Sequence, residues 1–459
     1  MPHGLTREPA GYPGTLTSMA QRFWVETLGC PKNSVDSDKV TGRLLADGYL
    51  PADAPDHADL VVVNTCAFIE EARQESIDTI LSLSDARRDG AEVVVTGCMA
   101  ERYGAELADA LPEVDRVVGF GGPVTATETG WVPVSIGGVG RTAAEPAVPA
   151  LDLLNMPRPA AAAPWAYVKV AEGCDRKCGF CAIPSFRGPQ RSRQRRDVVA
   201  EAETLAASGV REIVLVAQDL ASYGRDQGQG ARELVPLLDD LAAVVDRLRL
   251  LYLYPSELTD DLIDAICRTG VPYFDLSLQH VSRPLVRRMR RWGEGSRYLE
   301  RIHAIREREP DAAFRSNFIV GYPGETEADH DALLAFVEEA QLDWCGFFRY
   351  SAEDGTYAAD LDGEVPDALV ADRLFELRDL QDDITASRRD VLVGRTVSVL
   401  VDEPGVGRSH REAPEIDGII TVPEHLAIGS IVDVEVVAAE GPEVHAQLPT
   451  VGASSGRTA

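Results

Sequence analysis

Three closely spaced cysteines, in the stretch EGCDRKCGFC, constrain this chain more than any other feature of its sequence. Cys174, Cys178 and Cys181 have the spacing C-x3-C-x2-C and come directly after a strand-like run, AYVKVA. Three thiolates on one tight loop can hold three irons of a 4Fe-4S cluster, which normally has four cysteine ligands. The fourth iron would stay open to the amino and carboxylate groups of S-adenosylmethionine (SAM), whose sulfonium can accept one electron from the cluster.

A zinc site is the alternative for these cysteines. Zinc usually has four ligands, from paired C-x2-C or Cys/His sets, and no fourth ligand lies nearby in the sequence. The sequence therefore favours the cluster, and the spacing resembles the signature of the radical SAM superfamily.

Strand-like runs alternate with helical patterns from residue 165 to 390. The six runs are AYVKVA, EIVLVAQ, LRLLYLY, YFDLSLQ, FRSNFIVG and WCGFFRY. Such alternation predicts parallel strands, and six units predict a partial TIM-type (β/α) barrel. Its chemistry is expected at the carboxyl ends of the strands, where the cysteine loop begins.

A second set of cysteines emerges when strands are placed in residues 21 to 140. Cys30 follows RFWVETLG, Cys66 follows VVVNT and Cys98 follows VVVTG. We predict an α/β domain with a parallel sheet, at whose carboxyl edge the three thiols would meet. Each could instead be a small buried hydrophobe, as most free cysteines are. Three cysteines in equivalent positions favour a second 4Fe-4S cluster, again with one open iron.

The remaining two cysteines, Cys267 and Cys345, lie inside apolar helix and strand patterns, so packing explains them. Residues 141 to 164 are rich in Pro and Ala and predict a linker between domains. From residue 391 to 450, short β-rich runs predict a small OB-like β-barrel. We expect residues 1 to 20 and 451 to 459 to be disordered tails.

Charge and cysteine content limit the functional classes. The net charge of −29 disfavours non-specific binding to nucleic acid. Residues 392 to 450 have three Arg and no Lys against ten Asp and Glu, a net charge of −7. This balance suits a basic protein partner better than RNA, although it could serve solubility alone. Eight cysteines, without a secretory signal or a membrane-spanning apolar run, predict a cytoplasmic protein with metal or redox chemistry.

Two arginine clusters run against the acidic trend. We interpret them as solvated helix faces with local ion pairs, in preference to contacts with ribosomal RNA or an acidic substrate segment. They comprise Arg187, Arg191, Arg193, Arg195 and Arg196, and then Arg283, Arg287, Arg288, Arg290 and Arg291.

The order of these three regions resembles the methylthiotransferase family over residues 22 to 450. The resemblance implies two 4Fe-4S clusters, SAM as a cofactor and a TRAM-type C-terminal barrel. It implies that the barrel cluster generates the 5'-deoxyadenosyl radical, while the cluster at Cys30, Cys66 and Cys98 supplies sulfur. One SAM would methylate that sulfur, and another would be cleaved to abstract hydrogen from the substrate.

Local stretches resemble one branch of the family, the ribosomal-protein aspartate methylthiotransferases (RimO-type). These stretches are LGCPKNSVDSD, CAIPSFRG, DLSLQH and VGYPGETEAD. The tRNA branch (MiaB-type) typically has a GCQMN-like first motif and a PYTRG-like stretch, which this chain lacks. The resemblance implies that the substrate is the β-carbon of an aspartate in small-subunit ribosomal protein twelve, and the electron donor a flavodoxin or ferredoxin. A tRNA adenosine is the second candidate substrate, and a two-cluster redox or electron-transfer protein is the distant alternative.

Three further residues are candidate SAM contacts. Phe180 lies between two cysteine ligands and would shield the adenine, whereas Gln218 and Gly321 come at strand ends. Packing explains Phe180 nearly as well, and Gly321 could simply permit a turn. We expect no catalytic residues beyond the cluster ligands.

Overall fold

The computed structural model describes residues 20–125, 152–228 and 233–449. Within them, the N-terminal part is a parallel five-stranded sheet with the strand order β2-β1-β3-β4-β5. Its strands are β1 (Arg22–Thr27), β2 (Leu50–Pro51), β3 (Leu60–Thr65), β4 (Glu92–Gly97) and β5 (Arg116–Val117). Its helices are α1 (Pro31–Ala46), α2 (Glu70–Ala86) and α3 (Cys98–Ala110).

Helices cover both faces of this sheet, which explains why its strands read as continuous apolar runs. All six positions of β3 are buried. Val62 packs with Val40 of α1 on one face, and Val63 packs with Ile80 of α2 on the other. The predicted parallel α/β domain is therefore confirmed.

The central part is built from two parallel three-stranded sheets, with the orders β10-β9-β6 and β11-β12-β13. Their strands are β6 (Trp165–Lys169), β9 (Glu212–Val216), β10 (Arg247–Leu250), β11 (Tyr273–Gln279), β12 (Ala313–Val320) and β13 (Trp344–Arg349). A parallel bridge between Leu253 and Leu276 links the sheets. The six strands are the six predicted runs in sequence order, and they confirm the partial barrel.

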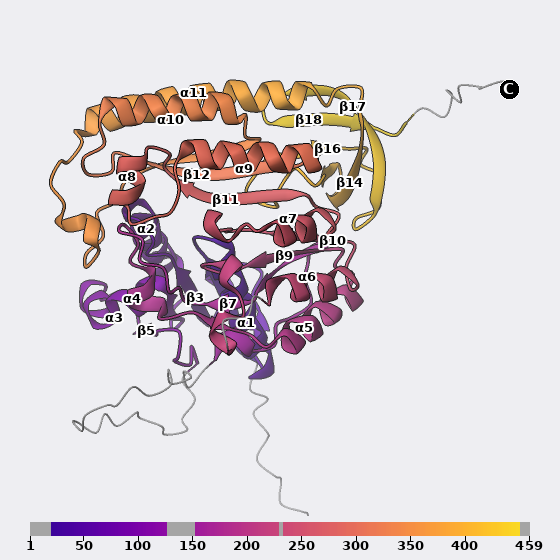
Figure 1. Ribbon diagram of the computed structural model, residues 1–459. Helices are drawn as coiled ribbons and strands as arrows, with labels where there is room; N and C mark the ends of the chain where they lie inside the picture. Colours follow the sequence, from indigo (N-terminus) through magenta and orange to yellow (C-terminus); the bar gives the residue numbers. More distant parts are fainter. Residues whose placement is uncertain (1–19, 126–151, 229–232, 450–459) are drawn as a thin grey trace, which may run out of the picture.

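Helices pack outside these strands (Figure 1). They are α5 (Arg195–Ala207), α6 (Leu234–Ala242), α7 (Asp260–Cys267), α9 (Gly295–Arg308), α10 (Glu327–Ala340) and α11 (Asp367–Asp390). The short elements are α4 (Ile183–Arg187), α8 (Arg283–Arg288), β7 (Ala171–Glu172) and β8 (Arg191–Ser192). Single 3-10 turns complete the described part: Pro55–His57, Leu153–Asn155, Leu220–Ser222, Arg225–Gln227, Pro255–Glu257 and Tyr357–Asp360. Cys267 and Cys345 pack against the core beneath these helices, as predicted.

The C-terminal part is a closed barrel with the order β14-β15-β16-β18-β17, which confirms the predicted OB-like domain. Its strands are β14 (Thr396–Glu403), β15 (Val406–Arg408), β16 (Ile420–Thr421), β17 (Ile431–Glu440) and β18 (Glu443–Gln447). Closure removes the exposed strand edges that a small sheet would otherwise present to other chains.

The segment between β15 and β16 closes the amino end of the central barrel. The hydroxyl of Tyr167 donates to the carbonyl of Pro414 at 2.8 Å, and Tyr273 donates to Asp417 Oδ2 at 2.6 Å. Ala413 lies in the same buried cluster as Tyr273 and Val35 of α1. The two flanking domains therefore both contribute to the interior of the central barrel, which the sequence patterns did not predict.

Part of the predicted linker is packed. Leu153 and Leu154 are buried, and Leu153 packs with Phe23 and Val40 of the N-terminal domain. Residues 141–151 of the linker, and nearly all of both predicted tails, lie outside the described residues. Among the described residues, no helix is both long and apolar enough to cross a membrane.

His280, which follows β11, should make the fold sensitive to acid. The ring is completely buried, and this burial lowers the pKa of His280 to about 4, well below its usual 6.5. Between pH 6.5 and pH 4 the unfolded chain binds a proton that the folded chain does not, so stability falls as the pH falls. We expect the wild type to lose about 2 kcal/mol more unfolding free energy than His280→Gln between pH 7 and pH 5, measured by urea denaturation. Parallel pH profiles for the two proteins would contradict this assignment.

Candidate functional site

Cys30, Cys66 and Cys98 meet at the carboxyl edge of the N-terminal sheet. Each follows a parallel strand: Cys30 caps α1 after β1, Cys66 follows β3, and Cys98 begins α3 after β4. Gly29 permits the approach of the first two, since a Cβ there would lie only 2.9 Å from Cys66 Sγ. Burial, and then the charges of Cys30 and Cys98, raise the pKa of Cys66 to about 12. The three thiols therefore lie close enough to oppose one another's ionisation.

Basic groups surround this set. Burial alone would raise the pKa of Cys30, but the charges of Lys32 and Arg187, together with hydrogen bonds from nearby backbone N–H groups, lower it below its usual value. Arg187 Nη2 donates to Cys98 Sγ at 3.0 Å and to Asn33 Oδ1 at 2.9 Å. Hydrogen bonds from charged donors stabilise an anionic sulfur, as cluster ligation requires.

Cys174, Cys178 and Cys181 lie together at the carboxyl end of the central barrel, beyond β6 and β7. Burial raises the pKa of Cys181 to about 12, to which the charges of Cys178 and Cys174 add. Arg291 Nη1 donates to Cys178 Sγ at 3.0 Å, and the backbone N–H of Arg176 donates to Cys174 Sγ at 3.4 Å. This set therefore has the same composition as the first: three thiols and a guanidinium donor.

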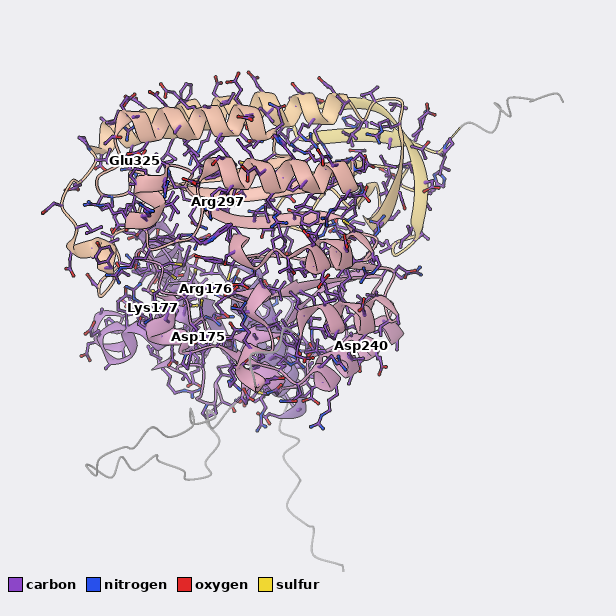
Figure 2. All side chains as sticks on the ribbon, in the orientation of Figure 1. Asp175, Arg176, Lys177, Asp240, Arg297 and Glu325 are labelled. Atoms are coloured by element: carbon purple, nitrogen blue, oxygen red, sulfur yellow. The ribbon has the colours of Figure 1, made fainter. Side chains whose placement is uncertain are left out.

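Arg176 fixes the cysteine loop to the barrel. Its guanidinium donates to Asp219 Oδ2 at 2.6 Å and to Glu257 Oε1 at 3.0 Å, and it lies 3.9 Å from the ring centroid of Tyr254. Arg291 lies 4.4 Å from the same ring. Figure 2 labels Arg176 together with its neighbours Asp175 and Lys177, close to the junction of the N-terminal domain and the barrel.

A buried ion-pair network connects the two cysteine sets. Arg187 is the last residue of α4, which begins two residues after Cys181. A residue only six positions after a cysteine of the barrel set therefore contacts the set of the N-terminal domain. Arg187 Nη1 donates to Glu172 Oε1 at 2.7 Å and pairs with Asp36 of α1 at 3.3 Å. Lys169 of β6 pairs with the same two carboxylates. Despite burial, Arg187 and Lys169 hold the pKa of Glu172 well below its usual value.

A second ion-pair cluster holds the N-terminal domain on the barrel. Arg73 of α2 pairs with Glu353, in the loop after β13, at 2.7 Å, and Arg102 of α3 binds the same carboxylate oxygen. Glu353 is buried, with 2% of its surface exposed. Ionic contacts from two helices therefore fix the edge that carries Cys30, Cys66 and Cys98 against the barrel.

Each of the three candidate SAM contacts also lies against other residues of the protein. Phe180 is half-buried against a small cluster around Tyr322, and Gln218 Nε2 donates to Glu172 Oε1 at 2.7 Å. Gly321 has a φ of +81°, and a Cβ there would lie 2.6 Å from a methyl carbon of Val370. The turn explains the glycine, so a role in SAM binding remains a prediction for all three residues.

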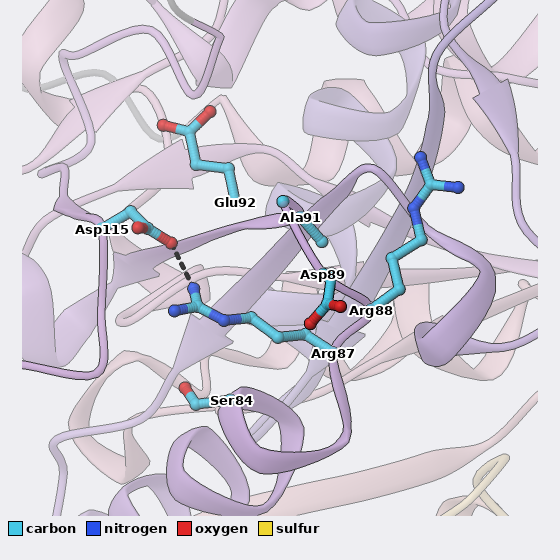
Figure 3. A pocket seen from close by; sticks show the side chains of 8 residues that line it. Ser84, Arg87, Arg88, Asp89, Ala91, Glu92 and Asp115 are labelled. Atoms are coloured by element: carbon cyan, nitrogen blue, oxygen red, sulfur yellow. Dashed lines mark hydrogen bonds and ion pairs between the residues drawn. The ribbon is translucent and has the colours of Figure 1, made fainter.

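The spacing of possible ligands bears on a single-ion site. Within the described residues, no three Cys, His, Asp or Glu side chains are placed to hold one metal ion. A 4Fe-4S cluster needs a wider spacing, because each thiolate binds a different iron. Figure 3 shows a pocket around Arg87, Asp89 and Asp115; it lies at the amino end of β4, opposite Cys98, and takes no part in this site.

Comparisons with known proteins show which families and relatives the chain is similar to. Residues 22–119 match the uncharacterized protein family UPF0004, residues 168–337 the radical SAM superfamily, and residues 393–448 the TRAM domain. Ribosomal protein uS12 methylthiotransferase RimO of Kineococcus radiotolerans is 42% identical over 446 residues, covering 88% of this chain and 91% of that protein. The protein of the same name from Moorella thermoacetica is 42% identical over 408 residues, covering 87% and 93%.

The chain belongs to the RimO-type radical SAM methylthiotransferase family. The predicted family and enzyme class are confirmed, and membership implies SAM and iron–sulfur chemistry. Among solved structures, the radical SAM methyltransferase TsrM of Kitasatospora setae, with cobalamin and a [4Fe-4S] cluster bound, is similar with a TM-score of 0.52. It is 16% identical and covers 90% of this chain and 84% of that one, a likeness that concerns the fold alone.

For this RimO-type chain, the interpretation of the arginine clusters as solvated was wrong at three of the ten positions. Arg187 and Arg193 are buried, and Arg291 contacts a cysteine sulfur. Arg195 and Arg196 do lie on the surface with local ion pairs. A hint was present in the sequence, because Arg187 follows Cys181 by only six residues. Charge periodicity cannot identify such a contact, because it depends on another domain.

Arg187 and Arg196 form a matched pair for testing the buried network. Arg187→Met removes one of the two cationic partners of Asp36 and Glu172, and breaking this buried ion-pair network should lower the unfolding free energy by about 3–5 kcal/mol. Arg196→Met removes an arginine of the same cluster whose side chain is 85% exposed, and should cost less than about 0.5 kcal/mol. Anaerobic urea denaturation measures both, and equal small losses would show that the network does not stabilise the fold.

Proposed function

We propose that this enzyme attaches a methylthio group to the β-carbon of an aspartate in the small-subunit ribosomal protein uS12. The observation that carries the proposal is the name shared by relatives that are 42% identical over most of the chain. The presence of two three-cysteine sets in one rigid arrangement supports the same reaction, which needs both a radical source and a sulfur source.

We assign one 4Fe-4S cluster to each set. Cys174, Cys178 and Cys181 would hold one, and Cys30, Cys66 and Cys98 the other. When bound, the first supplies an electron to SAM, and the second offers an open iron for sulfur. The protein's own part is to hold the six thiolates with Arg187 and Arg291 as charged donors, and to keep water away by burying the connection between the sets.

The C-terminal barrel supports a protein substrate over RNA. Its three arginines are engaged within the enzyme: Arg395 pairs with Asp311, Arg408 with Glu212, and Arg411 with Asp311. RNA binding depends on basic groups that face phosphates. With these arginines paired internally and a net charge of −7 in residues 392 to 450, the barrel is better suited to a basic ribosomal protein.

The remaining assignments complete the proposal. Phe180, Gln218 and Gly321, near the carboxyl end of the central barrel, would border the SAM site. A flavodoxin or ferredoxin would supply the electron, in the cytoplasm, where reduced thiols and ribosomal proteins occur together. Exposed Arg195 and Arg196 are available for a contact with ribosomal RNA.

The division of labour between the cysteine sets can be tested with a triple variant. Changing Cys30, Cys66 and Cys98 together to Ala should lower the iron content of anaerobically reconstituted protein from about eight to about four per chain. SAM cleavage to 5'-deoxyadenosine should persist, because the other set is intact, whereas methylthio transfer should stop. Loss of both activities in a folded triple variant would refute the assignment.

The substrate can be tested by direct competition. The reduced enzyme, with SAM and sulfide, is offered isolated uS12 and bulk tRNA, and both are followed by mass spectrometry. A gain of about 46 Da, one hydrogen replaced by a methylthio group, should appear on the protein alone. If the mass gain appears on tRNA adenosine and uS12 stays unmodified, the enzyme modifies RNA and the proposed substrate is wrong.

A further inference from the structure

Lysine is rare in this chain, and its positions are informative. Among 45 basic residues only four are lysines: Lys32, Lys39, Lys169 and Lys177. Lys177 is exposed in the cysteine loop, and the other three are buried. Lysine offers a compact point charge where arginine offers a planar fork, so the two are not interchangeable at a buried site.

Two of the buried lysines have carboxylate partners. Lys39 pairs with Glu201 at 2.8 Å, and Lys169 pairs with Glu172 at 2.6 Å. Lys32 differs: within the part of the chain that the structure describes, its ammonium forms no hydrogen bond or ion pair, although the residue is only 7% exposed. Instead, its ammonium lies 3.4 Å from the ring centroid of Tyr252.

A buried ammonium without an anion is costly. A cation–π contact stabilises the charge by less than the desolvation of that charge costs. The charge of Lys32 lowers the pKa of the Cys30 thiol, which we assign to iron. Among the described residues, the ammonium therefore has no carboxylate partner.

Lys32 lies where the N-terminal domain meets the central barrel. Lys32 lies two residues after Cys30, at the start of α1, and Tyr252 lies just past the carboxyl end of β10. Tyr252 has a left-handed backbone with φ +66°, and Asp275 Oδ2 accepts a hydrogen bond from its N–H at 2.9 Å. Such backbone strain concentrates at functional sites. Lys32 thus lies between the first cysteine set and the mouth of the barrel.

We propose that Lys32 binds the side-chain carboxylate of the substrate aspartate, with Tyr252 as the platform that orients its ammonium; this inference rests on the proposed function. The β-carbon of an aspartate is one bond, about 1.5 Å, from its carboxylate carbon. Fixing the carboxylate on Lys32 therefore fixes the reacting carbon beside Cys30. A neutral adenine base would leave this ammonium unpaired, so Lys32 also selects protein over RNA.

A double-mutant cycle tests this contact without relying on turnover. Binding of uS12 to the reconstituted enzyme is measured by titration, with uS12 carrying either the modified aspartate, located by tandem mass spectrometry, or Asn in its place. With wild-type enzyme the Asn form should bind about 30-fold more weakly, the effect of removing one partner of a buried charge pair. With Lys32→Met the two forms should bind alike, within about twofold, and as weakly as the Asn form binds to wild type.

Control variants separate recognition from structure. Arg43→Met removes one positive charge from the exposed end of the same helix and should leave the 30-fold difference unchanged. Lys32→Arg should restore part of it, because the charge returns in a different shape. Iron content and the electron paramagnetic resonance spectrum should match wild type in Lys32→Met; if that variant does not fold, Lys32→Gln replaces it.

The possible outcomes discriminate between the two proposals. If wild type modifies uS12 and Lys32→Met still distinguishes Asp from Asn by about 30-fold, the contact assigned to Lys32 is wrong while the proposed function stands. If Lys32→Met changes the electron paramagnetic resonance spectrum but still binds the Asp form of uS12 more tightly than the Asn form, Lys32 acts on the cluster and not on the substrate. If wild type modifies tRNA and not uS12, the proposed function fails and this inference falls with it.

Discussion

The buried guanidinium of Arg187 is the interaction on which the arrangement of the site depends. It contacts Cys98 of the N-terminal domain, Asp36 of α1 and Glu172 of the central barrel. A charge taken out of water at this depth is tolerated only when its donors are well satisfied. The partners of Arg187 come from both domains, so its guanidinium is satisfied only when the two domains are docked. Burying this charge without docking would be costly, and correct docking is therefore required for a stable fold.

Docking has a direct chemical consequence. In the proposed reaction a group passes between two cofactor sites, which requires a fixed separation of the sites and the exclusion of water. The short segment from Cys181 to Arg187, most of which forms helix α4, makes that separation a property of local backbone geometry. The clamp of Arg73 and Arg102 on Glu353 opposes rotation of the N-terminal domain about this connection.

The central barrel is completed by its neighbours at both ends. At the amino end, the 408–417 segment supplies Pro414 and Asp417 to the tyrosines of the strands, and toward the carboxyl end α1 brings Val35 and Lys32. An open barrel of six strands leaves interior positions that its own side chains cannot cover. The C-terminal domain is therefore a structural part of the catalytic unit, and its internally paired arginines follow from that role.

The sequence by itself determined the three domains, the six central strands, and the alignment of Cys30, Cys66 and Cys98 at one sheet edge. These features follow from local periodicity and from the rule that parallel strands end on a common edge. Only the tertiary structure decided what surrounds the thiols. Arg187 and Arg291 belong to runs that look like surface charge, and Lys32 looks like an ordinary first-turn residue of a helix. Their roles come from partners in other domains, and such partners are set by packing over long sequence separations, which no local pattern encodes.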